Sequence, residues 1–534
     1  MSIIFNDQVI AGSASGGEGI PPSECLNLEM TKLSSTKVSF KWADPGNTVI
    51  SGKTLCTWRG TKLVKKLGSF PLSPDDGVVV VDSQIKDHFR YNPLIVEGLG
   101  ASEYYYKLFP YSDHYIYNLS NKNQFGAYDY AFVIDNSDGN PYTRVTYYED
   151  SLSSNFTRAY MDFSNDQFVW GSHENAWWLP KPCMLHCGGA GSDEDYVDYY
   201  LNPNNYAEKL DGTASDYNNT SYSGNVMVEF PQIWTMYEFD PTDSNKFIIH
   251  LANKQISSQY TCYSHYNKDG DLVPYIYRGA YDGSYINSRT RCISNQTPGN
   301  SQIVSTEISY AQANGDYWFI DDLSTRLMIS NLLTYMSLST NSQGSFGNGF
   351  FSGGTSSNLL KSGLYDDKGL FWGVSTSGST VKTLGIENLW GNLWLRTAGY
   401  INKQGTQLIK LTPNINDGST ATSYNLDGTG YLTLDSSYNL GVNNNVGGTY
   451  ITSTALIPPY GIFPYGTYGN TGSATTYLCD GIYSNTSDTY YSLFGGSSNE
   501  ATMACGLYAV QLANSSDTGN WSRGTSLVCK PKKS

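Results

Sequence analysis

Short runs of aromatic and β-branched residues, separated by turn-forming Asn, Asp and Gly, constrain the fold of this chain most strongly. Val145–Asp150, Phe168–Trp170 and Ala176–Gly189 are runs of this kind. Such residues favour strands, and clusters of Gly, Asn and Asp favour turns. The 44 Tyr and 53 Gly among 534 residues support the same pattern. The sequence therefore predicts a mainly β protein with some helix (an α+β fold), divided into about two to four domains.

The charge and cysteine content exclude several classes of protein. A formal net charge of −15 argues against nucleic acid as a partner, because phosphate binding requires clustered Lys and Arg. Nine cysteines are an odd number and sparse for a disulfide scaffold, so we expect reduced thiols in a chain made in a cytoplasm.

Two further features argue against secretion and membrane insertion. The N-terminal sequence MSIIFNDQVIAG has neither a basic start nor a long apolar core, so it does not predict a Sec-type signal. The longest aliphatic stretch near this end, Val78–Val81, is too short to cross a bilayer. We therefore expect no membrane insertion.

Residues 1–24 are expected to combine a short strand with a flexible linker. Residues 1–10 can form the strand, and Ala11–Pro22 has the Gly- and Ser-rich composition of a linker. A short element on a flexible tether suggests docking to a partner protein. A frayed terminus is the alternative, and both readings stay open at this point.

Residues 25–120 show the alternation of a β-sandwich. Val38, Phe40 and Trp42 alternate with polar residues, which predicts a strand with one buried face. In the later run around Tyr104, we expect Lys107 to face water and Tyr104, Tyr106 and Leu108 to point inward.

This segment resembles a fibronectin type III domain. The resemblance rests on the strand end Trp42-Ala43-Asp44-Pro45 and on the spacing from Leu99 to Tyr104. It implies that Tyr104 is a corner tyrosine whose hydroxyl bonds to the backbone.

More specifically, the segment resembles modules of fibre and tail proteins from gut bacteriophages of the crAss-like, Bacteroidetes-infecting type. The matching residues are Trp58-Arg59-Gly60-Thr61, Pro71, Asp75-Asp76-Gly77 and Tyr104-Tyr105-Tyr106. Such modules space and present other domains, and they are rarely catalytic.

Residues 121–304 are expected to form a β-rich middle region. The stretch Asp198–Trp234 within it resembles segments of gut-phage fibre proteins in its overall sequence. It carries no mechanistic motif, so it predicts the class of protein and not a chemistry.

One segment departs from the β pattern. In IDDLSTRLMISNLLTYMSLST, apolar residues recur every three to four positions, with Asp321 or Asp322 placed as the N-cap. This periodicity predicts a helix whose apolar stripe, Leu323, Leu327, Leu332, Leu333 and Met336, faces the core.

Residues 305–534 resemble formylglycine-generating-enzyme-like (sulfatase-modifying-factor-like) domains, which belong to the wider C-type-lectin-like fold. The resemblance rests on the order of its parts, which are the helix, Gly385–Trp394 (GIENLWGNLW), Gly495-Gly496-Ser497, and Arg523-Gly524 leading into Leu527-Val528. Phage receptor-binding tips use this fold. The resemblance implies that the final strand closes the domain and that Leu507, Ala509, Leu527 and Val528 are structural.

The loop before the final strand is the candidate binding site. In the proteins it resembles, this loop lies on the ligand-facing side. Aromatic residues give contact area at low entropic cost, and Asn and Ser give adaptable hydrogen bonds. We therefore expect an exposed receptor- or partner-binding face, with Trp521 as its anchor; the alternative is that Trp521 packs under the loop. The candidate residues are Tyr490, Tyr491, Asn514, Ser515, Asp517, Asn520, Trp521 and Arg523.

Catalysis is not expected. The oxidising members of the resembling family use two cysteines four residues apart near the C-terminus, whereas Cys505 stands alone. Glu387 and Asp480 could serve as the carboxylate pair of a glycosidase, but their contexts are those of ordinary surface carboxylates. The six histidines are scattered and give no Ser-His-Asp arrangement.

No metal or other cofactor is predicted either. Cys183, His186 and Cys187 offer soft ligands, but no second pair follows at zinc-finger spacing. Asn267–Asp271 has alternating oxygen ligands but lacks the glycine and the bidentate glutamate of a calcium loop, so it predicts a turn.

Three functions follow as hypotheses. The first is a virion adhesin, a phage fibre or tail protein that binds a host surface glycan or protein. The second is a non-catalytic virion component such as a head fibre, collar or decoration protein. The third is a capsule-degrading enzyme. For the first two we expect a virion location, with assembly in the bacterial cytoplasm and docking to other virion proteins through the N-terminus. We also expect a homo-oligomer, with a trimer favoured by analogy with phage fibres.

Overall fold

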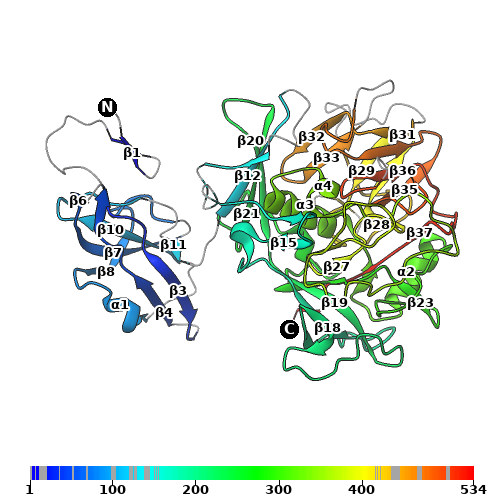
Figure 1. The fold of residues 1–534 in the computed structure, drawn as a ribbon, viewed down its shortest axis with the longest axis horizontal. Coiled ribbons are helices and arrows are strands. Elements are labelled where there is room, and N and C mark those ends of the chain that lie inside the picture. Colours follow the sequence, from blue (N-terminus) through cyan, green and yellow to red (C-terminus); the bar gives the residue numbers. More distant parts are fainter. Residues whose placement is uncertain are drawn as a thin grey trace. The chain divides into compact units, whose positions relative to one another are not determined.

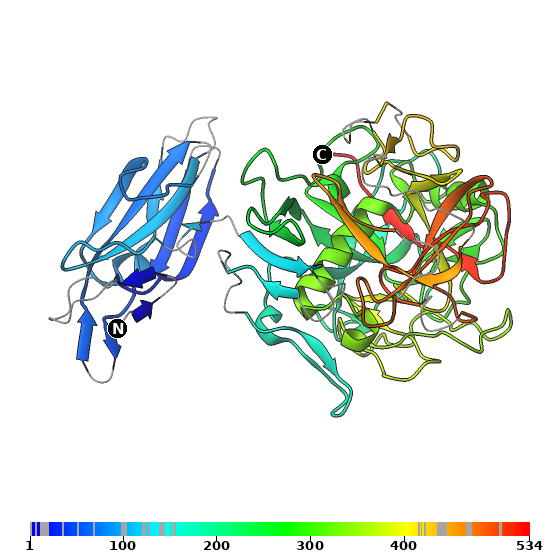
Figure 2. The ribbon, with the colours of Figure 1, turned by 90° about the horizontal axis from the view of Figure 1, so that it is seen from above.

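The computed structural model divides the chain into two compact units (Figures 1 and 2). Unit 1 comprises residues 1–130, 150–152 and 252–258, and unit 2 comprises residues 131–149, 153–251 and 259–534. The structure describes residues 3–5, 8–10, 21–34, 37–50, 53–67, 70–97, 104–119, 124–125, 129–137, 145–149, 151, 153, 156–414, 417, 419–420, 423–434, 446–465, 472–500 and 505–533.

Unit 1 contains two antiparallel sheets. The three-stranded sheet has the order β3-β4-β9, with bounds Leu26–Lys32, Val38–Ala43 and Leu94–Val96. The four-stranded sheet has the order β11-β10-β7-β8, with bounds Gln124–Phe125, Tyr104–Ser112, Trp58–Leu67 and Val78–Ser83. Unit 1 also contains a hairpin of β5 and β6 and the short helix α1, with bounds Thr48–Ile50, Lys53–Cys56 and His88–Tyr91.

The core of unit 1 lies between these sheets, as the sequence predicts for a β-sandwich. Phe40 and Trp42 from β4 pack with Leu63 from β7 and with Leu108 from β10. The Trp42 indole Nε1 donates a hydrogen bond of 3.0 Å to the Asp44 carboxylate. The predicted alternation of β4 is therefore confirmed, because its residues from Val38 to Trp42 alternate between buried and half-buried positions.

Strand β10 differs from its prediction at Lys107. Tyr106 and Leu108 point into the core as expected, but Lys107 is only 2% exposed. Its ammonium donates a hydrogen bond of 2.8 Å to the Leu119 carbonyl, and burial lowers its pKa to about 8. The expectation that Lys107 faces water is wrong, because both faces of β10 are covered.

The N-terminal segment contains the predicted strand. Residues Ile3–Phe5 (β1) pair with Gln8–Ile10 (β2) in an antiparallel hairpin. Most of the predicted linker, residues 11–20, lies outside the described residues, as does Leu99 of the expected corner motif.

Unit 2 is organised around two large sheets. The first has seven strands in the order β18-β17-β16-β19-β22-β38-β25, with bounds Asn205–Lys209, Val197–Asn202, Lys181–His186, Gly224–Pro231, Tyr275–Gly279, Leu527–Cys529 and Trp318–Ile320. Strand β38, near the chain end, lies between β22 and β25. Strands from both sides of the expected boundary at 304/305 thus share one sheet, and the boundary lies inside a single compact unit.

The second large sheet lies within the C-terminal half. Its order is β30-β29-β28-β35-β36-β34-β31, with bounds Leu432–Thr433, Thr406–Ile409, Trp394–Lys403, Thr489–Phe494, Val510–Leu512, Gly481–Ser484 and Val446–Tyr450. Strand β37, Arg523–Gly524, pairs in parallel with the start of β28.

Unit 2 also contains smaller sheets and two further helices. A four-stranded sheet has the order β13-β12-β21-β20, with bounds Val145–Tyr147, Asp129–Asp135, Lys246–Ala252 and Trp234–Phe239. The two-stranded pairs are β14–β15, β23–β24, β26–β27 and β32–β33, with bounds Tyr160–Asp162, Gln167–Val169, Ser284–Ile286, Arg289–Arg291, Lys382–Thr383, Ile386–Glu387, Ser453–Ile457 and Gly461–Tyr465. Unit 2 also contains α2, Val304–Gln312, and α4, Ser342–Phe346.

The predicted helix is α3, Leu323–Ser337, and its N-cap is Asp322, whose carboxylate accepts from the Thr325 amide. Figure 1 shows α3 between the β13-β12-β21-β20 sheet and the second large sheet, which has eight strands when β37 is included. Its Asn331 side chain donates to the Tyr237 hydroxyl on β20, and Leu323 belongs to the core that contains Tyr400 on β28. The helix is buried almost all round, so the prediction of a core helix is confirmed. Among the described residues, no helix is long and apolar enough to span a membrane.

Candidate functional site

The loop Asn514–Arg523 connects β36 to β37 and is the centre of the candidate site. Its tip, Asp517–Asn520, is exposed; the rest of the loop is half-buried, except for Ser522, which is buried. The Asp517 amide donates to the Ser515 hydroxyl at 3.3 Å. The Ser522 amide donates to the Asn520 side-chain oxygen at 3.0 Å. These local bonds are typical of tight polar turns, so the polar composition noted in the sequence shapes the loop itself.

Three backbone carbonyls at and beside the tip of the loop accept hydrogen bonds from other segments. The Ser516 carbonyl accepts from the amide of Val304 at the start of α2, and the Asn520 carbonyl accepts from the Ser301 amide, both at 3.0 Å. The Thr518 carbonyl accepts from the Arg396 guanidinium at 2.8 Å. Because these bonds fix the loop at three points, its exposed tip is presented by a preorganised backbone.

Arg396 is itself fixed by a buried ion pair. Its Nε lies 2.7 Å from a carboxylate oxygen of Glu307 on α2, an ion-pair contact without hydrogen-bond geometry, and both side chains are fully buried. The Tyr285 hydroxyl donates to the other oxygen of Glu307 at 2.9 Å. Burial raises the pKa of Glu307 to about 7, and the Arg396 charge opposes this shift. The pair thereby connects α2, β28 and the loop.

Trp521 lies at the edge of a small apolar cluster. It is half-buried and packs against Leu359, Leu393 and Leu395. The sequence left two readings open, an exposed anchor or a side chain packed under the loop. The structure gives this ring a packing role while leaving part of it at the surface.

Arg523 is also engaged within the loop. Its guanidinium donates to the Asn514 side-chain oxygen and, at 3.3 Å, to the Thr518 hydroxyl. Burial and the neighbouring Arg396 lower the pKa of Arg523 to about 10. The hydrogen bond between Arg523 and Asn514 therefore joins the two ends of the loop. The exposed polar groups lie at its tip.

The structure does not bring Tyr490 and Tyr491 to the surface. They are 6% and 1% exposed, respectively. Both belong to β35, which lies inside the eight-stranded sheet and is covered on both faces. The Tyr490 hydroxyl is 2.7 Å from that of Ser487. The expectation that these two rings form part of an exposed face is corrected here, because a central strand buries both of its alternating sets of side chains.

The motif Gly385–Trp394 supports the loop from within. Gly391 donates its amide to the Gly495 carbonyl, and the Trp394 amide donates to the carbonyl of Ser522 within the loop. Asn392 donates at 2.9 Å to the buried carboxylate of Asp282. The segments on which the family resemblance rests are thus in contact with one another, and the whole Gly385–Trp394 motif is buried.

The residues expected to be structural are buried in the core: Leu507, Ala509, Leu527 and Val528.

The carboxylates considered for glycoside hydrolysis are not at the surface. Glu387 is fully buried and accepts from the amides of Gly363 and Tyr365 at 2.8 and 2.7 Å. Asp480 is 3% exposed and accepts from the Tyr508 amide. Burial raises the pKa of both carboxyls, to about 7 for Glu387. The expectation of ordinary surface carboxylates is wrong, because each one caps backbone amides inside unit 2.

The soft-ligand motif and the acidic turn also have structural roles. Cys183 and Cys187 are buried thiols at and just after β16, and all nine cysteines are free. The Asn267 side chain accepts from the amides of Asp269 and Asp271 at 3.0 Å, which confirms the predicted turn. Within the described ranges, no group of three or more His, Cys, Asp or Glu side chains is arranged to hold a metal ion.

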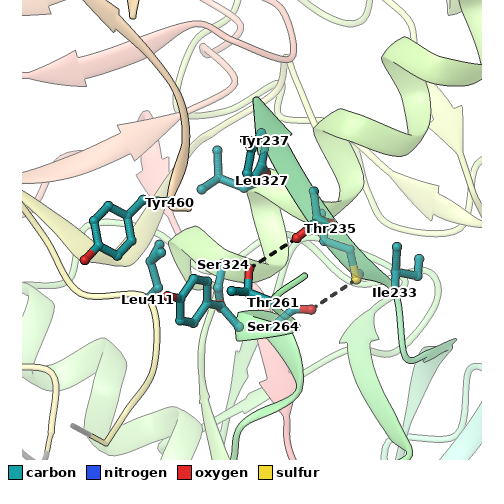
Figure 3. Close-up of a pocket in the computed structure, with 11 residues that line it drawn as sticks. Ile233, Thr235, Tyr237, Thr261, Ser264, Ser324, Leu327, Leu411 and Tyr460 are labelled. Atoms are coloured by element: carbon teal, nitrogen blue, oxygen red, sulfur yellow. Dashed lines mark hydrogen bonds between the residues drawn. The ribbon is translucent and has the colours of Figure 1, made fainter. Parts of the chain in front are cut away.

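A small cavity lies beside α3 (Figure 3). Side chains from β20, α3 and the segment around Thr261 line it, and the Thr261 hydroxyl donates to the Thr235 carbonyl at 3.3 Å. Its volume is about 20 Å³, and a water molecule needs about 10–15 Å³. The cavity suits one water molecule and is too small for a substrate.

Comparisons with known proteins assign the chain to no family. No protein-family model matches the chain, and a search of curated proteins finds no similar sequence.

Sequence reasoning missed the residues that hold the loop. Arg396 and Glu307 are 89 positions apart in the sequence, and each lies in a segment that reads as ordinary strand or helix. A charged residue within each element was the available signal, but a single sequence does not show that such residues meet.

Proposed function

We propose that the chain is a bacteriophage virion fibre or tail protein that attaches to the host bacterial surface through its C-terminal region. The observation that supports this most is the loop Asn514–Arg523, whose exposed polar tip is held by bonds to α2, β28 and residue Ser301. A preorganised loop loses little conformational entropy on binding, which favours recognition of a surface ligand. The separate β-sandwich of unit 1 fits a module that spaces and presents a binding domain.

Two variants test this proposal with matched chemistry. Asp517→Ala/Asn520→Ala removes the polar side chains at the loop tip. Asp211→Ala/Asn219→Ala is the control, because these residues also lie in exposed turns of unit 2 and Asn219 likewise accepts from the amide two residues on, at 3.1 Å.

Labelled full-length chain is incubated with cells of the bacterial strain on which the phage propagates, and bound chain is measured by flow cytometry. The loop variant should bind about tenfold more weakly than the wild type, as expected when interface residues of high energetic weight are removed. The control variant should bind as the wild type does. Equal binding by the two variants would contradict the role of the loop.

A second candidate is a virion component without host contact. The packing of Trp521 against Leu393 and Leu395 favours it, because the aromatic side chain expected to anchor a receptor is partly used inside the protein. For this candidate the wild-type chain is found in purified virions by mass spectrometry but neither binds cells nor reduces infection when added in excess.

A further inference from the structure

A groove in unit 2 lies at the C-terminal end of α2, whereas the loop contacts the N-terminal end of this helix. It opens beside β25, between the turn at Lys268 and the segment around Tyr424, and its volume is about 320 Å³. An adjoining hollow of about 550 Å³ shares Lys268, Gln312 and Asp316 with it. Pockets for small ligands typically measure about 300–1,000 Å³, so this groove has the size of a ligand site.

The groove and the loop are separate places. The loop bonds to Val304, the first residue of α2, whereas Gln312, the last residue of α2, lines the groove. A helix rises about 1.5 Å per residue, which places these two ends about 12 Å apart. An inference about the groove therefore stands or falls independently of the proposed attachment loop.

One wall of the groove is aromatic. Phe319 on β25 and Tyr424 are half-buried, and their ring centroids lie 5.5 Å apart. The Tyr424 hydroxyl is shielded from solvent and has no hydrogen-bond partner among the described residues. An unpaired, shielded hydroxyl costs free energy, and a ligand hydroxyl or a water that reached it would remove that cost.

The polar side chains that line the groove carry little net charge. The Lys530 ammonium lies 2.9 Å from the Asp322 carboxylate, and Lys268 lies 3.5 Å from Asp269. These two pairs neutralise four of the charged groups that line the groove. Asp316 remains as an exposed carboxylate beside the exposed amide of Gln312. This balance disfavours an anionic ligand and offers hydrogen-bond acceptors and a donor.

We propose that this groove binds a neutral oligosaccharide. The apolar C–H faces of a pyranose ring suit the aromatic wall formed by Phe319 and Tyr424. The sugar hydroxyls suit the acceptors Asp316 and Gln312 and the free hydroxyl of Tyr424. The adjoining hollow extends the site, so more than one sugar ring fits along it.

The test uses the full chain and four neutral disaccharides, namely maltose, cellobiose, lactose and N,N′-diacetylchitobiose. Saturation-transfer NMR detects which of them binds, and titration gives Kd. Tyr424→Phe removes only the unpaired hydroxyl, and Gln312→Ala removes the exposed amide. Tyr275→Phe is the matched control, because Tyr275 is a 41% exposed tyrosine of unit 2 that does not line the groove.

We expect at least one disaccharide to bind, with Kd raised about fivefold by Tyr424→Phe and by Gln312→Ala, the effect of losing one hydrogen bond. Tyr275→Phe should leave Kd unchanged. The inference is overturned if none of the four disaccharides binds, or if both groove variants bind as the wild type does. Equal or tighter binding of 3′-sialyllactose would overturn the neutral class. Because the cell-binding test uses loop variants, failure of one test leaves the other intact.

Discussion

Unit 1 and unit 2 differ in where they place their ion pairs. In unit 1, the Lys37–Glu97 and Lys66–Asp76 pairs are exposed or half-exposed. Unit 2 also has exposed pairs, such as Lys268–Asp269 and Lys532–Asp193, but it contains four pairs that are buried: Arg278–Asp321, Arg326–Asp321, Arg396–Glu307 and Lys530–Asp322. Exposed pairs contribute little to stability, whereas a buried pair is strongly destabilising when one partner is removed.

The difference reflects the kind of contact that stabilises each unit. The core of unit 1 lies between two sheets whose inward side chains are mostly apolar. Unit 2 includes long polar loops, and charged side chains such as Arg396 reach from a strand to their backbone carbonyls. Apolar packing is non-directional, while a buried guanidinium fixes particular atoms. We infer that buried charge in unit 2 serves to position loops.

The largest expected effect is that of Arg396→Met. The substitution leaves Glu307 buried without its cation, which should lower the free energy of unfolding of unit 2 by about 3–5 kcal/mol. Lys37→Ala, which breaks an exposed pair in unit 1, should cost about 1 kcal/mol or less. Chemical denaturation of the full chain, followed by probes in each unit, measures both values.

A double variant separates the lost pair from lost packing. Arg396→Met/Glu307→Gln leaves no buried charge unpaired and should recover part of the stability lost in Arg396→Met. A cost below about 1 kcal/mol for Arg396→Met would remove the contrast between the two units.

A smaller effect is expected in the pH dependence of unit 2. Because the pKa of Glu307 is raised to about 7 in the folded state, folding favours its protonated form. Its contribution is therefore complete below its ordinary pKa of 4.5 and is lost as the pH rises through 7. Glu307→Gln removes this titration, so between pH 5 and pH 7.5 the melting temperature of the wild type should fall more steeply than that of the variant.

Other buried groups titrate in the same range, so the comparison must be made between the two chains and not on the wild type alone. Asp282, with a pKa raised to about 7 by burial, acts in the same direction as Glu307. His173, with a pKa lowered to about 4 by burial, acts in the opposite direction. Glu97→Gln at the exposed pair of unit 1 is the control. Parallel pH curves for the wild type and Glu307→Gln would contradict the prediction.

The smallest effect is expected from Tyr104→Phe. The corner-tyrosine expectation assigns the Tyr104 hydroxyl a backbone hydrogen bond, but it has no such partner in the part of the chain that the structure describes. Its ring lies 4.6 Å from the Lys65 ammonium instead. The loss should stay within about 0.5 kcal/mol.

The neighbouring residue provides a matched comparison. The Tyr105 hydroxyl donates to the Gln255 carbonyl at 3.0 Å, so Tyr105→Phe should cost about 1 kcal/mol. Thermal unfolding of unit 1 in both variants decides which tyrosine serves as the corner. A larger loss for Tyr104→Phe than for Tyr105→Phe would restore the original assignment.

The candidate site was predictable from the sequence only in part. The position and polarity of the loop tip at Asp517 and Asn520 follow from local composition, and the structure exposes both. The burial of Tyr490 and Tyr491 does not follow from it, because a tyrosine pair reads equally well as surface or core. Their burial depends on β28 and β36 pairing on either side of β35.

The sequence by itself determined the features that depend on near neighbours. The three-to-four-residue periodicity and the Asp322 cap specify α3, and the alternation from Val38 to Trp42 specifies β4, because these signals involve contacts within one element. Only the tertiary structure decided that β38 pairs into the same sheet as β16, a strand far earlier in the chain, and that Arg396 meets Glu307. Both depend on pairing between residues far apart in the chain, and local propensity carries no information about which distant partner covers a strand or neutralises a buried charge.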